Sequence, residues 1–446
     1  MIKQRLTPTA LRAPWWQLPL IALSAIIVGG TGLLFWVASD FAHKILHLWV
    51  QFNPFLPLLL TPLGFVLISA ITNKFFMSAL GSGVPQTMAA LDYCQPNHRK
   101  KLLSIPIAIA KLSLTVLGQM CGASIGQEGP MVHIGASIMY SLGKIIPAHK
   151  LSRHQLDHGL IVGGAAAGVA AAFNAPLTGI VFALERLTKT FEMSSIAALL
   201  TIVAVTTAIC APILDGHRYF GDTSAALAYG SGWMAVPVCG VVGGIFGGLF
   251  SYCFSPLSTP AFILRLRLLG PLRFSAFCGF CVAVLGLLSG STIYGNGAQE
   301  IEQLLQNPQN LPWHYSLIKF LATFISCFSG IPGGLFAPSL AIGAGIGANI
   351  SAFMPATPAA AIILLGVTAY FSAVFQAPFT AFVIVAEITG NYAMLPPLII
   401  TAFIGTGVSR LIGARPIYEA FVERWREPNA TKLEADHSMF KKMGRK

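Results

Sequence analysis

Four short stretches of the chain share one local pattern: a turn containing glycine or arginine, then a proline, then an apolar run typical of a helix. They lie at 81–85, 126–130, 333–338 and 413–416. Each helix start offers backbone N–H groups without intrahelical partners and a partial positive charge, and glycine lets backbone approach a ligand closely. One such stretch alone would be an ordinary helix entry. Several directed at one point could hold an anion without a full positive charge.

An acidic side chain, Glu128, stands inside the second stretch, which reads GQEGP. An ionisable group within an apolar segment is a functional candidate by default. Beside an anion site, its carboxylate can occupy an anion position and leave it when it is protonated, and burial disfavours its charged form. The simpler alternative is a carboxylate that only caps the following helix. The surrounding pattern favours the first role, a gate.

Other ionisable residues lie in apolar runs with less defined roles. Glu185 and Glu387 close equivalent positions in an internal repeat, where a structural ion pair or helix cap is the simpler interpretation. The sequence leaves open whether the role of Lys111 is structural or functional. His133 follows the second stretch and is expected to be a packing histidine whose hydrogen bonds are satisfied.

An internal repeat supports a shared site. Residues 126–135 align with 334–343, and 173–178 align with 375–380. Repeated halves with interrupted helices indicate a site near the middle of the membrane, at the interface of the halves. We predict halves of about 18–213 and 233–425, and the residues leave open whether the two are inverted.

The composition predicts lipid as the main solvent. The chain has 446 residues, of which 55% are hydrophobic and 10% charged, whereas soluble domains carry about 25% charged residues. Residues 18–38 are long enough to cross a bilayer, with a cleavable signal peptide as the alternative. The 44 glycines and 28 prolines interrupt many other apolar runs. We therefore expect an all-α integral membrane protein with tilted and broken helices.

The net charge of +12 is distributed in a way that favours membrane orientation over nucleic-acid binding. Basic residues collect near the N-terminus, at 97–101 and in the tail. By the positive-inside rule, the N-terminal segment 1–17 and the charged tail 426–446 are expected in the cytoplasm, near anionic lipid. The eight cysteines form no disulfide framework, and we expect no metal and no cofactor.

The motifs resemble those of the CLC family of chloride channels and chloride/proton exchangers. GSGVP at 81–85 is similar to the family's GSGIP, GQEGP at 126–130 to GREGP, and GLFAP at 334–338 to GxFxP, while Tyr418 falls where the family places a tyrosine. The resemblance spans about residues 18–425. It implies two inverted halves, a homodimer with one pore in each subunit, and a multi-pass protein of a bacterial inner membrane without CBS domains.

The resemblance also implies roles for particular residues. Chloride is the bound substrate, and its central site takes two hydroxyls and two backbone N–H groups, those of Ser82, Tyr418, Leu335 and Phe336. Backbone at Gln127 and Gly129 lines an outer site, Glu128 is the gate, and Ser82 favours chloride over fluoride.

Three departures from the family pattern matter. Gln127 replaces an arginine, Gln86 replaces a frequent glutamate, and Arg186 stands where exchangers carry an inner proton-transfer glutamate. Arginine stays charged and cannot cycle a proton. Proton coupling therefore stays open between a fully coupled antiporter and a passive or weakly coupled conductor. A membrane-embedded enzyme using Glu128, His133 or Glu185 is the remaining alternative, but no second polar cluster near Glu128 supports it.

Overall fold

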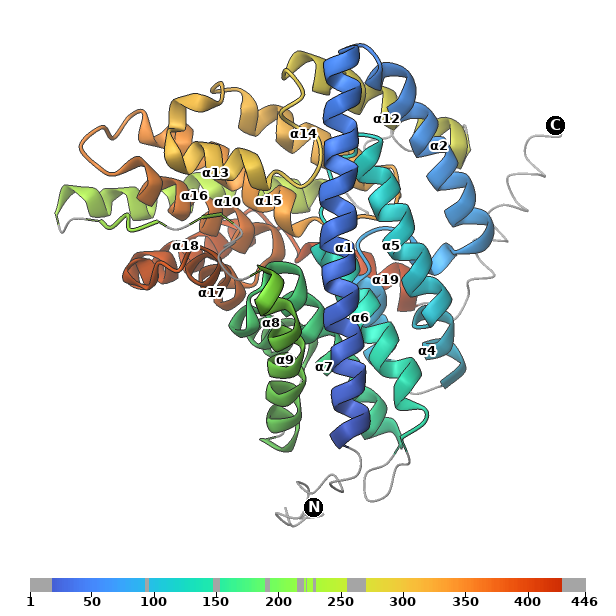
Figure 1. Cartoon of the computed structure of the whole chain (residues 1–446). Coiled ribbons are helices and arrows are strands. Elements are labelled where there is room, and N and C mark those ends of the chain that lie inside the picture. The colour runs from blue at the N-terminus through green and yellow to red at the C-terminus, as the bar shows by residue number, and fades with distance from the viewer. Residues whose placement is uncertain are drawn as a thin grey trace.

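The computed structural model describes residues 18–92, 96–146, 153–188, 193–214, 220–221, 223–227, 230–254 and 270–426. Within these ranges the chain is helical apart from turns and one isolated bridge (Figure 1). Eight of the described helices are long and apolar enough to cross a membrane, while others are short. The prediction of an all-α membrane protein with broken helices is confirmed.

The described helices of the first half are α1 (Leu18–Phe52), α2 (Pro57–Phe75), α3 (Val84–Asp92), α4 (Pro96–Leu102), α5 (Ile105–Met120), α6 (Glu128–Gly143), α7 (Arg153–Phe173), α8 (Pro176–Phe182) and α9 (Met193–Leu214). The crossing expected at 18–38 is part of a longer helix, because neither glycine nor proline interrupts the chain again before Pro54. The second half contains α10 (Ala235–Cys253), α12 (Pro271–Leu288), α13 (Ala298–Gln306), α14 (Tyr315–Phe328), α15 (Phe336–Ser351), α16 (Ala359–Phe375), α17 (Pro378–Thr389), α18 (Leu395–Leu411) and α19 (Ile417–Arg426).

Two buried helix pairs, α6 with α7 and α15 with α16, form the centre of the fold, and small residues bring their backbones together. A Cβ added to Gly135 of α6 would overlap the carbonyl of Gly164 on α7. A Cβ added to Gly343 of α15 would lie 2.7 Å from the carbonyl oxygen of Gly366 on α16. Close packing through small residues is typical of helix contacts in membranes. The first helix of each pair, α6 or α15, begins within one of the aligned stretches 126–135 and 334–343. The two pairs are therefore equivalent in the repeat and also pack in the same way.

The two halves meet through reciprocal contacts. The backbone N–H of Gly126 donates to the carbonyl of Gly334 at 2.9 Å, and the N–H of Gly334 donates to the carbonyl of Gly126 at 2.7 Å. An exchange of identical roles is what an approximate two-fold axis between the halves produces. The repeat inferred from the sequence is therefore visible in the structure, while the bounds of the halves stay a prediction.

Glu185 and Glu387 cap helices of the opposite half. The carboxylate of Glu387 accepts hydrogen bonds from the backbone N–H groups of Leu177 and Thr178 at 2.8 and 2.7 Å, in the first turn of α8. Glu185 accepts from the N–H groups of residues 379 and 380 at 3.0 and 2.7 Å, in the first turn of α17. Negative charge is stabilising at a helix N-terminus. The structural interpretation of these two glutamates is confirmed.

Two buried lysines hold equivalent turns. Lys111 Nζ donates to the carbonyls of Ala79 and Gly81 at 2.7 and 2.6 Å, ahead of α3. Lys319 Nζ donates to the carbonyl of Gly295 at 3.0 Å, ahead of α13. Both lysines are fully buried. Each donates hydrogen bonds to turn carbonyl oxygens that would otherwise lack partners, and these bonds compensate the cost of burying the amine. The open role of Lys111 is thus structural in this fold.

Candidate functional site

Two hydroxyl groups that are distant in sequence meet in the interior. Ser82 Oγ lies 3.5 Å from the Tyr418 hydroxyl oxygen, although the residues are 336 positions apart. Ser82 is carried by the turn that Lys111 holds, and Tyr418 lies in the first turn of α19. The side chains are 7% and 1% exposed. The structure therefore brings together the two hydroxyls that the resemblance assigned to one site.

The N-terminus of α6 reaches the same point. A Cβ added to Gly129 would overlap the Ser82 hydroxyl and would lie 3.2 Å from the Cα of Gly334. Glycine at position 129 is what allows this helix start to approach Ser82 so closely. The backbone N–H groups of the first turn, which have no partner within the helix, are then available beside the hydroxyl.

The N-terminus of α15 arrives from the second half. Leu335 precedes this helix and Phe336 begins it, and both side chains are 1% exposed. The Phe336 ring centroid lies 5.8 Å from that of Tyr418. Two helix starts and two hydroxyls therefore converge, as the motif pattern predicted. Such a cluster of oriented dipoles is suited to a small anion.

Glu128 lies between the two halves. Its side chain is fully buried, and its Oε2 accepts a hydrogen bond of 3.4 Å from the backbone N–H of Ala337 in the first turn of α15. A carboxylate of one half thus occupies the positive end of a helix from the other half, where an anion would be stabilised in the same way. His133, one turn further along α6, is buried and contacts the Leu102 carbonyl at 2.9 Å through Nε2, as expected for a packing histidine. Its Nδ1 has no hydrogen-bond partner among the described residues, so the expectation that its hydrogen bonds are satisfied holds for one ring nitrogen only.

Arg186 lies near Tyr418, at the end of the π-helical segment that follows α8. Its side chain is 10% exposed, and its Nη2 donates to Glu419 Oε1 at 3.4 Å. Because a buried unpaired charge is costly, the sequence predicts that Arg186 either reaches the cytoplasmic face or pairs with a carboxylate, with Glu192 or an acid of the tail as open partners. Glu192 lies outside the described residues. The partner in the structure is Glu419, and its adjacency to Tyr418 is the signal that could have revealed it.

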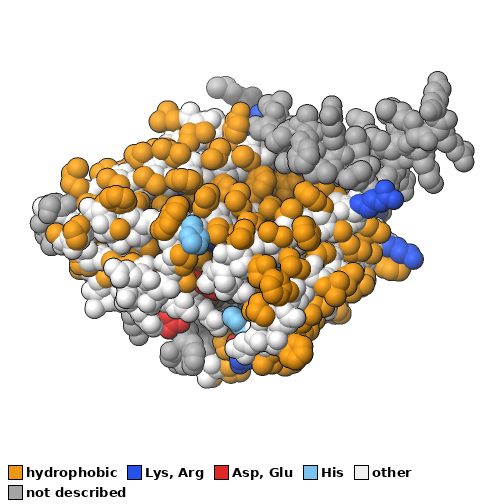
Figure 2. Space-filling view, turned by 90° about the horizontal axis from the view of Figure 1, so that it is seen from above, with side chains coloured by type: hydrophobic (Ala, Val, Ile, Leu, Met, Phe, Trp, Pro, Cys, Tyr) orange, Lys and Arg blue, Asp and Glu red, His pale blue; other side chains and the backbone are white. Residues whose placement is uncertain are grey.

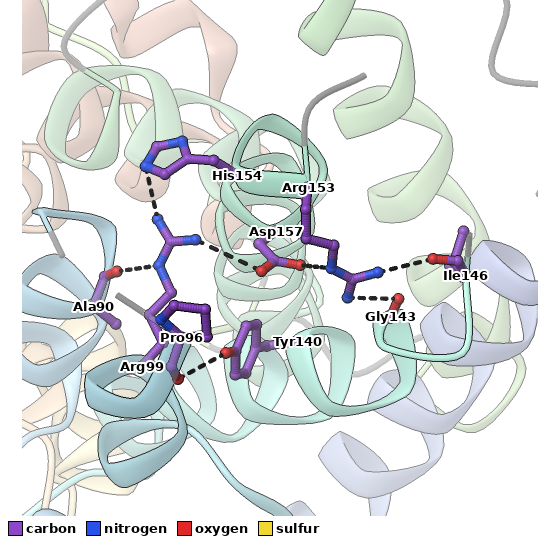
Figure 3. Close-up of polar contacts among 9 residues, drawn as sticks. All are labelled: Ala90, Pro96, Arg99, Tyr140, Gly143, Ile146, Arg153, His154 and Asp157. Carbon is purple, nitrogen blue, oxygen red and sulfur yellow. Dashed lines mark hydrogen bonds and ion pairs between the residues drawn. The ribbon is translucent and has the colours of Figure 1, made fainter. Parts of the chain in front are cut away.

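An ion-pair network anchors the helices that carry the site (Figure 3). The Arg99 side chain of α4 is 1% exposed and donates from Nε to the Ala90 carbonyl of α3 at 3.0 Å. Its Nη1 lies 3.7 Å from Asp157 of α7, which also pairs with Arg153 at 2.8 Å. The Tyr140 hydroxyl of α6 donates to the backbone of α4. These contacts fix α3, α6 and α7 relative to one another, so that the turn before α3 keeps its place beside α6.

Residues 64–410 match the family model described as voltage gated chloride channel. A H(+)/Cl(-) exchange transporter of Yersinia pestis bv. Antiqua (strain Angola) is 28% identical over 91% of this chain and 87% of its own length. One of Klebsiella pneumoniae subsp. pneumoniae is 31% identical over 82% of this chain and 79% of its own length. These relatives are transporters and not enzymes.

Solved structures share the fold. A slow cyanobacterial Cl-/H+ antiporter aligns with a TM-score of 0.80 at 24% identity, covering 92% of this chain and 98% of that one. A CLC-type fluoride/proton antiporter aligns with a TM-score of 0.73 at 22% identity, covering 92% and 99%. Since the family model covers most of the chain and these structures share its arrangement of helices, the chain belongs to the voltage gated chloride channel family, the CLC family.

Proposed function

We propose that the chain is a transmembrane chloride transport protein in which Glu128 is the gate. The observation that carries the proposal is the position of the Glu128 carboxylate, 3.4 Å from the N–H of Ala337 at the start of α15. The hydroxyl pair of Ser82 and Tyr418 supports a chloride site next to it. The relatives named H(+)/Cl(-) exchange transporters support the choice of chloride, which is bound as substrate without a cofactor.

The proposed central site combines neutral donors only. The hydroxyls of Ser82 and Tyr418 and the backbone N–H groups of Leu335 and Phe336 hold the ion, and backbone at Gln127 and Gly129 lines an outer position. The nearby amine of Lys111 donates to backbone carbonyls. Donors without full charge bind an anion firmly enough to select it and weakly enough to release it, as conduction requires.

Glu128 acts by competition in this mechanism. Its charged carboxylate and a chloride ion are stabilised by the same helix N-termini, so they exclude each other. Protonation removes the charge and the advantage of the carboxylate at that position, and chloride then takes its place. Chloride transport therefore rises when Glu128 is protonated.

Arg186 bears on proton coupling. As a fixed cation near Tyr418, it attracts anions to the inner end of the pathway and repels protons there. Its pairing with Glu419, which is 54% exposed, screens this charge only in part. A passive or weakly coupled conductor needs Glu128 alone. A fully coupled chloride/proton antiporter is favoured by the names of the relatives and needs an inner proton route that bypasses Arg186.

We further propose a homodimer in a bacterial inner membrane, with both termini in the cytoplasm. The exposed apolar faces of the repeat-related helices α8 and α17 support the interface: Leu177 is 51% exposed and Phe379 is 50% exposed. These helices are capped by the glutamates of the opposite half, which holds the two faces side by side.

The experiment that tests the proposed function is simultaneous measurement of chloride and proton flux from the purified protein in liposomes of phosphatidylethanolamine and phosphatidylglycerol. Chloride flux that depends on the protein and on pH supports the proposal. Chloride flux without proton counter-flow selects the passive conductor, and a fixed ratio of the two selects the antiporter. A protein that moves no chloride contradicts the proposal.

A further inference from the structure

A cavity of about 290 Å³ lies between the end of α1 and the start of α13, on the side of the fold opposite the first described residues of α1. Figure 2 looks onto this side and shows histidine and acidic side chains on a surface that otherwise carries few charges. The acids and histidines that line the cavity are Asp40, His43, His47, Glu300 and Glu302. Among the described residues, neither lysine nor arginine lines it.

Two amide oxygens in the lining have no hydrogen-bond partner among the described residues. They are Oε1 of Gln127, which is 2% exposed, and Oδ1 of Asn174. Gln127 is the N-cap of α6, and Asn174 lies between α7 and α8. A buried acceptor without a partner indicates a missing donor. The cavity therefore offers two acceptors to a ligand that carries N–H or O–H groups.

The internal repeat indicates which donor fits Asn174. Its counterpart in the alignment of 173–178 with 375–380 is Gln376, and both residues have a left-handed backbone, with φ of 52° and 49°. Oε1 of Gln376 accepts a hydrogen bond of 3.3 Å from Nε of Arg410 on α18. In the first half, α9 follows α8 as α18 follows α17, and α9 contains no arginine or lysine. Asn174 thus keeps the acceptor of the repeat, while α9 lacks the guanidinium that meets it in the second half.

The charges around the cavity favour a cation. The carboxylates of Asp40, Glu300 and Glu302 line it. Two amines oppose them in this described part of the chain: Lys44 pairs with Asp40 at 2.6 Å, and the amine of Lys319 is held by backbone carbonyls. With neutral histidines, three carboxylates against two amines leave one negative charge. This balance attracts a monovalent cation and repels an anion.

The volume and the donor geometry restrict the ligand further. Ligand pockets commonly measure about 300–1,000 Å³, so a cavity of about 290 Å³ takes a small molecule. A guanidinium group carries its N–H donors in one plane and can reach an amide oxygen and a carboxylate at the same time. A compact ammonium group does not offer this planar arrangement.

We propose that this cavity binds a small guanidinium cation from the outer solution, which donates to Oδ1 of Asn174 and Oε1 of Gln127 and is balanced by Glu300. No covalent bond forms or breaks. Gln127 directly precedes Glu128, so the bound charge lies beside the gate and stabilises its carboxylate form. Occupancy of the cavity therefore slows chloride flux. This last step rests on the proposed gating role of Glu128, whereas the binding of the cation does not.

The test is equilibrium binding of radiolabelled methylguanidinium to the detergent-purified protein. The wild-type chain is expected to bind one cation. Asn174→Gly removes an acceptor and keeps the left-handed backbone, so the affinity should fall by about 10- to 100-fold. Glu300→Gln, which removes a negative charge, should cause a loss of similar size. The control Glu423→Gln removes an exposed carboxylate that is not part of the cavity lining, and it should bind like the wild-type protein.

Two further measurements address the chemistry of the ligand and its effect. In Gln127→Arg a tethered guanidinium fills the cavity, so methylguanidinium should no longer bind. Methylammonium has the same charge without the planar donors, and it should bind the wild-type protein at least about tenfold more weakly. In liposomes, external methylguanidinium should slow wild-type chloride flux and have little effect on the flux of Asn174→Gly at the same concentration.

Three outcomes overturn the inference. If the wild-type protein shows no saturable binding, or if Asn174→Gly, Glu300→Gln and Gln127→Arg all bind with wild-type affinity, the cation has no site in this cavity. If methylammonium binds equally well, the assignment to a guanidinium is wrong. If binding leaves wild-type chloride flux unchanged, the inhibitory role is wrong. A protein that binds methylguanidinium in this cavity and moves no chloride supports the site and contradicts the proposed function instead.

Discussion

Replacing Gly129 with alanine is expected to weaken chloride binding, because the added methyl group displaces the Ser82 hydroxyl. The Cβ would overlap Ser82 Oγ, whereas its next neighbour, the Cα of Gly334, lies at 3.2 Å and needs only a small shift. The hydroxyl is the easier group to move, since its rotamer can change. The central site then loses one hydrogen bond to a charged ion, about 1.5–3 kcal/mol. At about 1.4 kcal/mol per tenfold change, chloride affinity falls by about 10- to 100-fold.

Calorimetric titration of the detergent-purified protein with chloride measures this loss. Ser82→Ala should cost about as much as Gly129→Ala, and the double variant should cost little more than either, because both remove the same hydroxyl. Gly407→Ala is the control, since a Cβ there meets no atom within 4 Å. Normal affinity in Gly129→Ala, or losses that add in the double variant, would refute the convergence of α6 and Ser82 on one ion.

Three further predictions address the halves, the inner end and the assembly. Glu185→Gln and Glu387→Gln should each lower the free energy of unfolding by about 1–2 kcal/mol, the size of a helix cap. Thermal unfolding in detergent should show similar losses for the two variants. A large loss in one variant and a negligible loss in the other would contradict the reciprocal caps. Arg186→Ala should leave any chloride-to-proton ratio unchanged in liposomes, and loss of proton flux alone would give it a direct part in coupling. Light scattering in mild detergent should find a dimer; an active monomer would argue against the interface.

Much of this architecture could be predicted from sequence because it depends on local signals. Glycine and proline mark helix starts, so the stretches at 81–85 and 126–130 indicated an anion site and singled out Glu128, while the resemblance to the CLC motif implied the role of Ser82. The aligned halves predicted that Glu185 and Glu387 would play equivalent parts, and both are caps. Each of these motifs is a few residues long, so it can be recognised from the sequence without knowledge of the three-dimensional contacts.

Contacts between distant segments could not be predicted in the same way. The pairing of Arg186 with Glu419 depends on where α19 returns in space. The carbonyl contacts of Lys111 require a turn that lies 30 residues away. The cavity at His43 was missed because α1 was expected to end near residue 38. The spacing of Asp40, His43 and His47 at three and four residues, one face of a helix, was the available signal.

The measurement that tests the central claim most directly is chloride flux from liposomes as a function of pH, compared between the wild-type protein and Glu128→Gln, which mimics the protonated side chain. A gate at Glu128 predicts wild-type flux that rises as pH falls, and mutant flux that persists and no longer depends on pH. Mutant flux that keeps the wild-type pH dependence would place the gate elsewhere and contradict the role of Glu128.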